Sequence, residues 1–178
     1  MWKSVAVFCG SKFGNNNLFA QHAEQVGLLL AQKNIQLVYG GGRKGLMGMV
    51  ANSAIKNNGK VVGVIPALLN EKEDIHTELE TLHIVETMHE RKKKMFELCE
   101  AAIILPGGFG TLDELFEMIT WNNLSIHDKA IILLNSDGYY NNLLAHLERM
   151  QQEGFLYLPW QESFFTISGP NELVSLMA

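Results

Sequence analysis

The chain has 178 residues, of which 47% are hydrophobic and 19% are charged. That balance excludes a disordered chain, and the length suffices for one domain with a substantial core but not for two ordinary ones. The formal net charge of −5 argues against a nucleic-acid backbone as a general partner, although a local basic pocket could hold one phosphate. We therefore expect residues 1–178 to form a single globular domain that does not bind nucleic acid.

The first apolar run, residues 5–9, has the length of a strand and is too short for a signal-peptide core or a membrane span. The two cysteines, Cys9 and Cys99, lie far apart and lack a Cys-x-x-Cys spacing. We interpret both as reduced, buried thiols of an intracellular protein. The sequence thus predicts a cytoplasmic protein with no membrane partner.

Along the chain, short apolar runs typical of strands alternate with segments of helical periodicity. The expected strands are residues 5–9, 36–39, 61–65, 83–85, 102–105 and 130–134, with an edge strand at 163–167. The expected helices are residues 18–32, 46–57, 88–100, 112–121 and 140–152, with a short last helix at 171–177. This alternation, with nearly all-apolar strands, predicts an α/β, Rossmann-like parallel sheet with helices on both faces.

Residues 66–82 interrupt this regularity, because they carry several carboxylates and no clear period. We expect a solvated connection that includes a helical turn. A lid over the functional site is the alternative.

Three expected strands end in glycine-rich turns that lead into helices, at residues 9–14, 40–48 and 106–111. In a parallel sheet these turns lie at the carboxyl ends of the strands, which is where ligands bind. Glycine lets the backbone approach a ligand closely, and the exposed N–H groups at a helix start favour an anion. The turns therefore predict an anion-binding edge of the sheet.

The second turn matches the dinucleotide pattern G-x-G-x-x-G through Gly40, Gly42 and Gly45. A dinucleotide site would also need an acidic residue about 20 residues further on, at the end of the next strand. That strand is followed by Pro66, and no carboxylate occurs before Glu71, which argues against NAD. A P-loop would need Lys-Ser or Lys-Thr after the last glycine, where this chain has Leu-Met, which argues against a kinase or NTPase.

The third turn ends with Thr111 and Glu114, which are spaced as a capping box. One interpretation is that Glu114 only caps its own helix. The expected helix already has an apolar stripe: Leu112, Leu115, Phe116 and Ile119. Glu114 lies off this stripe and beside a strand end, so the second interpretation is a carboxylate that reaches a sugar held by the turn.

Four consecutive basic residues, 91–94, open the helix that follows the fourth strand. Such a run is usually a solvated face. The apolar residues of this helix, however, share one helical row: Met88, Met95 and Cys99. Arg91 and Lys92 lie between them, so at least one cation should border the inward face. A cation in a first turn opposes the helix dipole, and an anionic ligand or Glu114 would compensate for it.

No metal site is expected, because the histidines lack ligand spacing: His76, His83, His89 and His127. Cys9 is not expected to act as a nucleophile, because the sequence places no base beside it.

These motifs together resemble the Lonely Guy (LOG) family of cytokinin riboside 5′-monophosphate phosphoribohydrolases, long described as lysine decarboxylases. The family pattern PGGxGTxxE stands intact at residues 106–114, and its companion Met-His-x-Arg-Lys stands at residues 88–92. The turn at 40–48 and the segments 9–11, 126–129 and 137–140 are also similar to the family. The likeness extends from the first strand to about Phe155, and the tail from Tyr157 carries no known motif.

The resemblance implies where a nucleotide would lie. The 5′-phosphate is expected on the backbone of the third turn, at Gly107, Gly108, Gly110 and Thr111, with help from the threonine hydroxyl. Further binding residues are expected around it: Ser11, Gly42, Gly45 and Lys92. The base would lie toward Met88 and Arg91.

The resemblance also implies the chemistry, which is hydrolysis of the bond between the ribose and a purine. Glu114 would stabilise the cationic ribose, hold its hydroxyls or orient water, and the protonated guanidinium of Arg91 would donate a hydrogen bond to the leaving purine. The products would be ribose 5-phosphate and adenine or an N6-substituted adenine. No cofactor and no metal are implied, and a homodimer is expected.

Three other readings stay open from the sequence. A non-catalytic nucleotide-binding or carrier protein would use the same turns without turnover. A transferase would pass the ribosyl group to another base. A pyridoxal phosphate decarboxylase would need a Schiff-base lysine, and the chain is small for such a fold.

Overall fold

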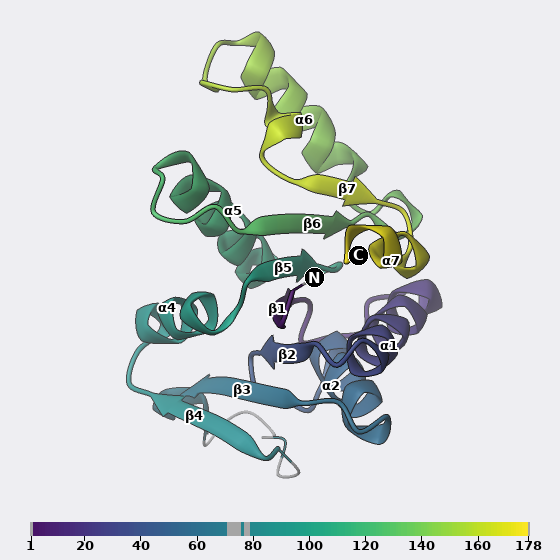
Figure 1. Ribbon diagram of the computed structural model, residues 1–178. Helices are drawn as coiled ribbons and strands as arrows, with labels where there is room; N and C mark the ends of the chain where they lie inside the picture. Colours follow the sequence, from purple (N-terminus) through teal and green to yellow (C-terminus); the bar gives the residue numbers. More distant parts are fainter. Residues whose placement is uncertain (1, 71–75, 77–78, 178) are drawn as a thin grey trace.

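A computed structural model describes residues 2–70, 76 and 79–177 of the protein. Seven parallel strands form one sheet in the order β4-β3-β2-β1-β5-β6-β7 (Figure 1). The strands are β1 (Ser4–Phe8), β2 (Gln36–Tyr39), β3 (Val61–Pro66), β4 (Thr81–Val85), β5 (Ala101–Ile104), β6 (Ala130–Leu134) and β7 (Phe165–Ile167). The helices are α1 (Asn17–Gln32), α2 (Gly45–Lys56), α3 (Ala67–Asn70), α4 (Met88–Leu98), α5 (Phe109–Asn123), α6 (Asn141–Gln152) and α7 (Leu173–Leu176). The predicted α/β parallel sheet is confirmed.

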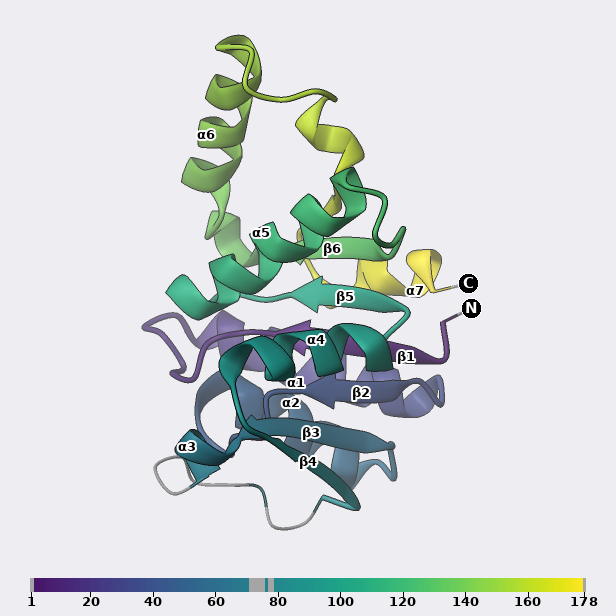
Figure 2. The same cartoon turned by 90° about the vertical axis from the view of Figure 1, so that its left-hand side faces the viewer.

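Helices cover both faces of the sheet, as Figure 2 shows from the side. Residues of α1, α2 and α7 pack into one apolar cluster, and residues of α4, α5 and α6 pack into the other. Successive residues of β1 alternate between the clusters, with Val7 in the first and Phe8 in the second. Burial on both sides explains why the strands read as continuous apolar runs rather than as alternating ones.

The chain changes direction across the sheet at β1. From β1 it proceeds outward through β2 and β3 to the edge strand β4, and it then returns to place β5 on the other side of β1. The turns that follow β1 and β5 therefore lie next to each other, and the Gly10 N–H donates a hydrogen bond to the Pro106 carbonyl oxygen (3.0 Å). A reversal of this kind opens a crevice at the carboxyl ends of the strands.

The start of α5 differs from the prediction. The helix begins at Phe109 with Gly108 as its N-cap, and no side chain caps it. The capping-box interpretation of Thr111 and Glu114 is therefore wrong, because Thr111 already lies inside the helix.

A threonine cap occurs instead at α4. Thr87 Oγ1 accepts a hydrogen bond from the Glu90 N–H (3.1 Å), and the Glu90 carboxylate accepts one from the Glu86 N–H (2.9 Å). At the other end of α4, the Lys129 ammonium donates to the carbonyl oxygens of Phe96 and Cys99, which places a cation at the negative end of the helix dipole.

Other boundaries differ by a few residues. Helix α4 ends at Leu98, because Cys99 is already extended, and the last expected helix consists of a 3-10 turn (Pro170–Glu172) followed by α7. In the expected connection 66–82, β3 continues through Pro66, and α3 supplies the helical turn. Residues 71–75 and 77–78, where a lid was the alternative, lie outside the described residues. No helix in the described part of the chain is long and apolar enough to cross a membrane.

Candidate active site

A cavity of about 380 Å³ lies at the carboxyl ends of β1 and β2, between the first turns of α4 and α5. Most residues that the sequence singled out line it: Ser11, Met88, Arg91, Lys92, Gly108, Gly110, Thr111 and Glu114. These residues come from three separate motifs, and the fold brings them together around one space. A second cavity of about 240 Å³ adjoins the first through Gly10, Ser11 and Gly108, and Gly107 lines it.

Gly45 packs against the first glycine-rich turn. A Cβ at Gly45 would lie 2.3 Å from the Ser11 carbonyl carbon, and the φ angle of +60° at Gly45 is one that side-chain-bearing residues rarely adopt. Glycine therefore lets the start of α2 close against the first turn, where the Leu46 N–H donates to the Gly10 carbonyl oxygen (3.0 Å). Gly42 is buried. Within the described residues, neither glycine lines the two cavities.

The N-terminus of α5 opens into the larger cavity. The first N–H groups of a helix have no partner within the helix, and Phe109, Gly110 and Thr111 line the cavity at this position. A Cβ at Gly108 or Gly110 would meet no atom of the described residues within 4 Å, so that part of the chain leaves the surface of the turn open. Uncapped N–H groups beside a cavity form a site for an anion.

Gly107 is tightly packed against the same helix. A Cβ at this position would lie 2.1 Å from Thr111 Oγ1, and Thr111 itself is buried. Glycine is therefore required for the third turn to fold back over the threonine side chain.

Arg91 points inward from α4 and is only 8% exposed. Its Nη2 donates to the Gly40 carbonyl oxygen (3.4 Å), and its Nη1 lies 4.0 Å from Met88 Sδ. A Cβ at Gly40 would lie 1.9 Å from Nη2, so Gly40 provides the space for the guanidinium. Among the described residues Nε has no hydrogen-bond partner, which leaves donor capacity for a ligand.

Glu114 lies in the same cavity. Its burial raises the pKa of the carboxyl group to about 7, against the opposing charge of Arg91. Asp113 and Glu117 raise this pKa further, whereas Lys92 lowers it. A carboxyl group that is partly protonated near neutral pH is suited to proton transfer, and buried carboxyl groups of this kind gather at active sites.

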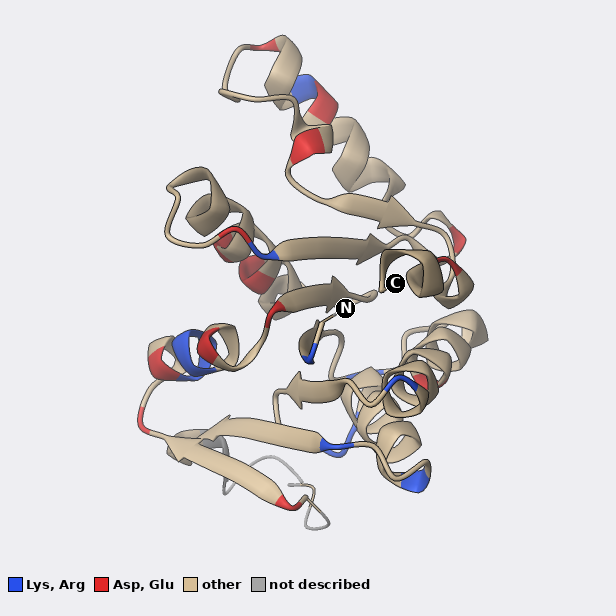
Figure 3. Cartoon of the chain, in the orientation of Figure 1, with Lys and Arg blue, Asp and Glu red and all other residues tan. Residues whose placement is uncertain are grey.

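Lys92 lines the cavity, but its ammonium bonds to two carboxylates of α5. Its Nζ lies 3.0 Å from Asp113 Oδ2 and 3.0 Å from Glu117 Oε2. Burial alone would lower the pKa of Lys92, and the hydrogen bonds and charges of Asp113 and Glu117 outweigh this and raise it. Figure 3 shows the basic segment of α4 and the acidic segments of α5 on neighbouring helices. Any contact of Lys92 with a ligand would compete with these ion pairs.

Neither cysteine carries reactive character. Both are free and buried, and burial raises the pKa of the Cys9 thiol far above its usual range. Among the described residues, no group of three or more histidine, cysteine or acidic side chains could hold a metal ion. His76 is buried and lies 2.7 Å from Asn52 Oδ1 through its Nε2, and His127 packs against the rings of Phe96 and Trp121.

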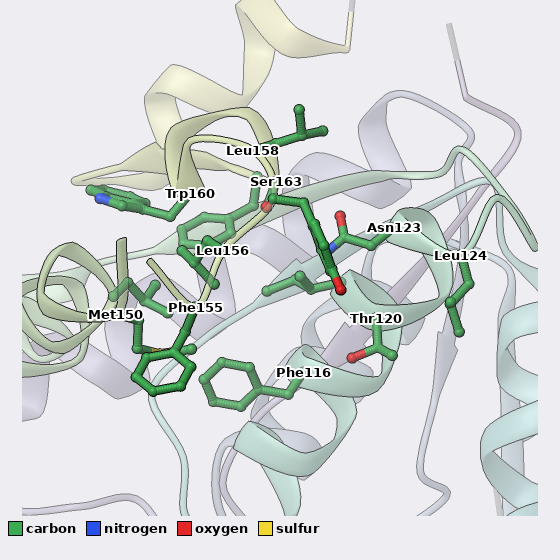
Figure 4. Close-up of a pocket in the computed structure, with 14 residues that line it drawn as sticks. Phe116, Thr120, Asn123, Leu124, Met150, Phe155, Leu156, Leu158, Trp160 and Ser163 are labelled. Atoms are coloured by element: carbon green, nitrogen blue, oxygen red, sulfur yellow. The ribbon is translucent and has the colours of Figure 1, made fainter. Parts of the chain in front are cut away.

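A separate cavity of about 410 Å³ lies between α5, α6 and the segment 155–164, and it is mostly apolar (Figure 4). Phe116 of α5 and Phe155 of the segment point into it (Figure 4). None of the described residues that line it is a carboxylate, lysine, arginine or histidine. No sequence pattern predicted this cavity, because its lining comes from distant segments without a motif.

Several contributors to the site were missed by the sequence. They are Gly40, which makes room for Arg91; Asp113 and Glu117, which hold Lys92; and Tyr139, whose hydroxyl donates to the Gly107 carbonyl oxygen (2.6 Å). The family-like segment 137–140 was a signal for Tyr139, but it suggested no role.

A family model described as "Possible lysine decarboxylase" matches residues 47–177. A cytokinin riboside 5′-monophosphate phosphoribohydrolase of Rhodococcoides fascians is 47% identical over 155 residues, which cover 86% of this chain and 78% of that protein. The chain belongs to the LOG family. A second cytokinin riboside 5′-monophosphate phosphoribohydrolase, LOG1 of Arabidopsis thaliana, is 44% identical to this chain over 155 residues. The match covers 87% of this chain and 73% of that protein. The probable enzyme LOGL1 of Oryza sativa subsp. japonica is 43% identical and covers 97% of this chain and 78% of that protein.

Solved structures share the fold of this LOG family member. A molybdenum cofactor binding protein from Rippkaea orientalis has a TM-score of 0.74 and 21% identity, and the match covers 99% of this chain and 96% of that one. The molybdenum cofactor carrier protein of Chlamydomonas reinhardtii has a TM-score of 0.73 and 13% identity, and the match likewise covers 99% of this chain and 96% of that one. At this identity the likeness extends to the Rossmann-like architecture alone.

Proposed function

We propose that this LOG family member hydrolyses the N-glycosidic bond of a cytokinin-type purine nucleoside 5′-monophosphate, to free base and ribose 5-phosphate. One observation carries the proposal. Arg91 and Glu114 line a single cavity together with the uncapped N-terminus of α5. This arrangement occurs in a chain that is 41–47% identical to relatives named for that activity.

The 5′-phosphate binds at the start of α5. There the backbone N–H groups of the third turn donate to its oxygens, and the helix dipole favours its charge. Gly108 and Gly110 leave the approach open, since no side chain of the described residues covers them. A nucleoside without the phosphate loses these contacts and becomes a poor substrate.

Bond cleavage builds positive charge at C1′ of the ribose and negative charge on the purine. The ionised Glu114 stabilises the ribose and accepts a proton from the water that attacks C1′, while the electrons of the broken bond move to the purine nitrogen. Transfer of a proton to that nitrogen then gives the neutral base, and loss of the proton from Glu114 restores its carboxylate. The pKa of about 7 makes this carboxyl group a suitable base near neutral pH.

Arg91 donates a hydrogen bond to the departing purine from the donor side that the protein leaves unpaired. This contact stabilises the charge that develops in the transition state. If Arg91→Ala weakened substrate binding but left the chemical step unchanged, this role would be wrong.

The base lies toward Met88 at the cavity mouth. Met88 is 45% exposed and Phe109 is 94% exposed, and both line the cavity. Apolar side chains open to solvent at this point suit an N6 substituent such as a prenyl group better than the bare amino group of AMP.

The first experiment incubates the purified protein with isopentenyladenosine 5′-monophosphate and with AMP, and resolves free base and ribose 5-phosphate by chromatography. The unphosphorylated nucleoside and the Glu114→Gln variant serve as controls. Base released from the monophosphates alone, and lost in the variant, supports the hydrolase. Binding without release would refute it and favour a nucleotide carrier. A labelled second base that appears as a nucleotide would identify a transferase instead.

We also propose a homodimer. Large apolar side chains are exposed around the cavity of Figure 4, with Phe155 77%, Leu158 59% and Leu124 65% exposed. An exposed apolar patch of this kind marks an interaction site. Light scattering after size exclusion measures the mass, and Leu158→Glu should shift it toward that of a single chain.

We propose the cytoplasm as the compartment. Both cysteines are free and buried, as in proteins of reducing compartments. Cell fractionation tests this.

A further inference from the structure

Three successive carbonyl groups, of Leu105 and of the first two residues of the third turn, each accept a hydrogen bond from another segment. Leu105 accepts from the Tyr140 hydroxyl (2.6 Å), Pro106 from the Gly10 N–H (3.0 Å) and Gly107 from the Tyr139 hydroxyl (2.6 Å). Two adjacent tyrosines thus hold the turn on either side of the proline. Neither tyrosine lines the larger cavity, within the described residues.

The peptide group is planar and trans, so its C=O and N–H point in opposite directions. Fixing the Gly107 carbonyl toward Tyr139 therefore fixes the Gly108 N–H away from Tyr139. Gly108 lines both cavities, whereas Tyr139 lines only the smaller of these two cavities. The Gly108 N–H is thereby aimed to the side of the larger cavity.

On its Gly107 side this peptide is packed against Thr111, and the Gly108 carbonyl oxygen accepts from the Leu112 N–H (3.1 Å), whereas its Gly108 side is open. It joins two glycines, which have wide conformational freedom, and a Cβ at Gly108 would meet no atom of the described residues within 4 Å. Tyr139 itself is well held, although it is 45% exposed. Its ring packs edge-on against Phe19 (5.4 Å between centroids) and Tyr140 (4.8 Å).

We propose that Tyr139 is a positioning residue that aims the Gly108 N–H at the substrate phosphate. The inference rests on the proposed function, because the anion is the 5′-phosphate of the nucleotide. Tyr139 lines the smaller cavity and does not line the larger one, where Arg91 and Glu114 lie, within the described residues.

Tyr140 offers a matched control within the same turn. Its hydroxyl makes an equally short hydrogen bond to Leu105. The peptide between Leu105 and Pro106, however, has no N–H to aim, because proline lacks one. Tyr140→Phe should therefore lower stability, since a buried carbonyl loses its partner, without changing phosphate affinity.

The experiment measures binding of ribose 5-phosphate and of adenine by calorimetry to the wild type, Tyr139→Phe and Tyr140→Phe. Tyr139→Phe keeps the ring contacts and should raise the Kd of ribose 5-phosphate about three- to tenfold, the value of one hydrogen bond. The Kd of adenine should not change. In turnover, KM for the nucleotide should rise by the same factor with kcat nearly constant, as for a contact made equally in ground and transition states.

Equal affinity of the wild type and Tyr139→Phe for ribose 5-phosphate would overturn the role of Tyr139 and leave the proposed function intact. An equal loss in Tyr140→Phe would also overturn it, because a general loosening of the turn would then be the cause. A wild type that binds no ribose 5-phosphate and releases no base would refute both proposals together.

Discussion

Replacing Gly40 with alanine should impair the site chiefly through Arg91, because the new Cβ would lie 3.2 Å from Met47 Sδ but far closer to the guanidinium. The new Cβ would lie 1.9 Å from Arg91 Nη2 and 3.1 Å from Cζ. Ordinary contact begins near 3.4 Å, so the guanidinium must withdraw by about 1.5 Å. A displacement of about 1 Å in a catalytic group can cost about 100-fold in rate. We therefore expect Gly40→Ala to lower kcat/KM for the nucleotide about 100-fold.

The fold should tolerate this change, because the clash falls on the far end of a flexible side chain. Thermal unfolding of Gly40→Ala should give a Tm within about 3 °C of the wild type, corresponding to less than about 1 kcal/mol. Gly169→Ala is the matched control, because a Cβ at Gly169 meets no atom closer than 3.9 Å and the residue lies outside the site. It should leave kcat/KM unchanged.

A double-mutant cycle provides the decisive comparison. Because both changes act on the same guanidinium, Gly40→Ala in the Arg91→Ala background should cost little more than Arg91→Ala alone. A further 100-fold loss in that background would refute the reasoning, since Gly40 would then act by another route.

Four further predictions concern charge. The log of kcat/KM should rise with pH up to about 7 and then level off, because the pKa of Glu114 is about 7, and the limb should vanish in Glu114→Gln. Burial raises the pKa of Glu114 above the ordinary 4.5, so the stability that this carboxyl group contributes is present below about pH 4.5 and is lost as the pH rises through about 7. The Tm of Glu114→Gln minus the Tm of the wild type should therefore be larger at pH 8 than at pH 4. Lys92→Met should shift the rising part of the kcat/KM profile to higher pH, and an unmoved profile would contradict the coupling of Lys92 to Glu114. The same variant should lower the free energy of unfolding in urea by about 1–3 kcal/mol, less than for a fully buried ion pair because Asp113 is exposed. Lys129→Met should lower the free energy of unfolding by about 1–2 kcal/mol with kcat/KM unchanged, because the end of α4 loses its cationic donor; a stability equal to that of the wild type would show that water replaces the lysine.

The sequence predicted the sheet well because its strands are buried on both faces. A continuous apolar run such as Ala130–Leu134 indicates a strand of a parallel sheet that is covered by helices on both faces. The glycine turns were equally informative, since their place at strand ends predicted the cavity edge. Arg91 and Glu114 were brought to that edge by motifs that follow two different strands, and the structure places both around one cavity.

Local sequence patterns did not predict the helix caps and ion pairs that depend on the surrounding fold. The pattern Thr-x-x-Glu stands at the start of two described helices, at residues 87–90 and at residues 111–114, and of these two only the first caps its helix. The second lies inside α5, because the helix starts earlier, at a glycine N-cap that no short pattern distinguishes from a loop. The sequence likewise did not predict that Lys92 pairs with Asp113 and Glu117, because these residues are 21 or more positions away, on a helix that only the fold brings close.

The hydrogen bonds between the glycine turns have a consequence for amide exchange. The Gly10 N–H is bonded to Pro106, and the Leu46 N–H is bonded to Gly10, so segments from three strands are joined at one edge. Deuterium can enter these amides only when β1 separates from β5 or when α2 leaves the sheet, and both events approach global unfolding. Their exchange should therefore be among the slowest in the chain, although they border an open cavity. If exchange is this slow, the edge at which we propose that the phosphate binds is held in place before any nucleotide arrives, and little ordering entropy is lost on binding.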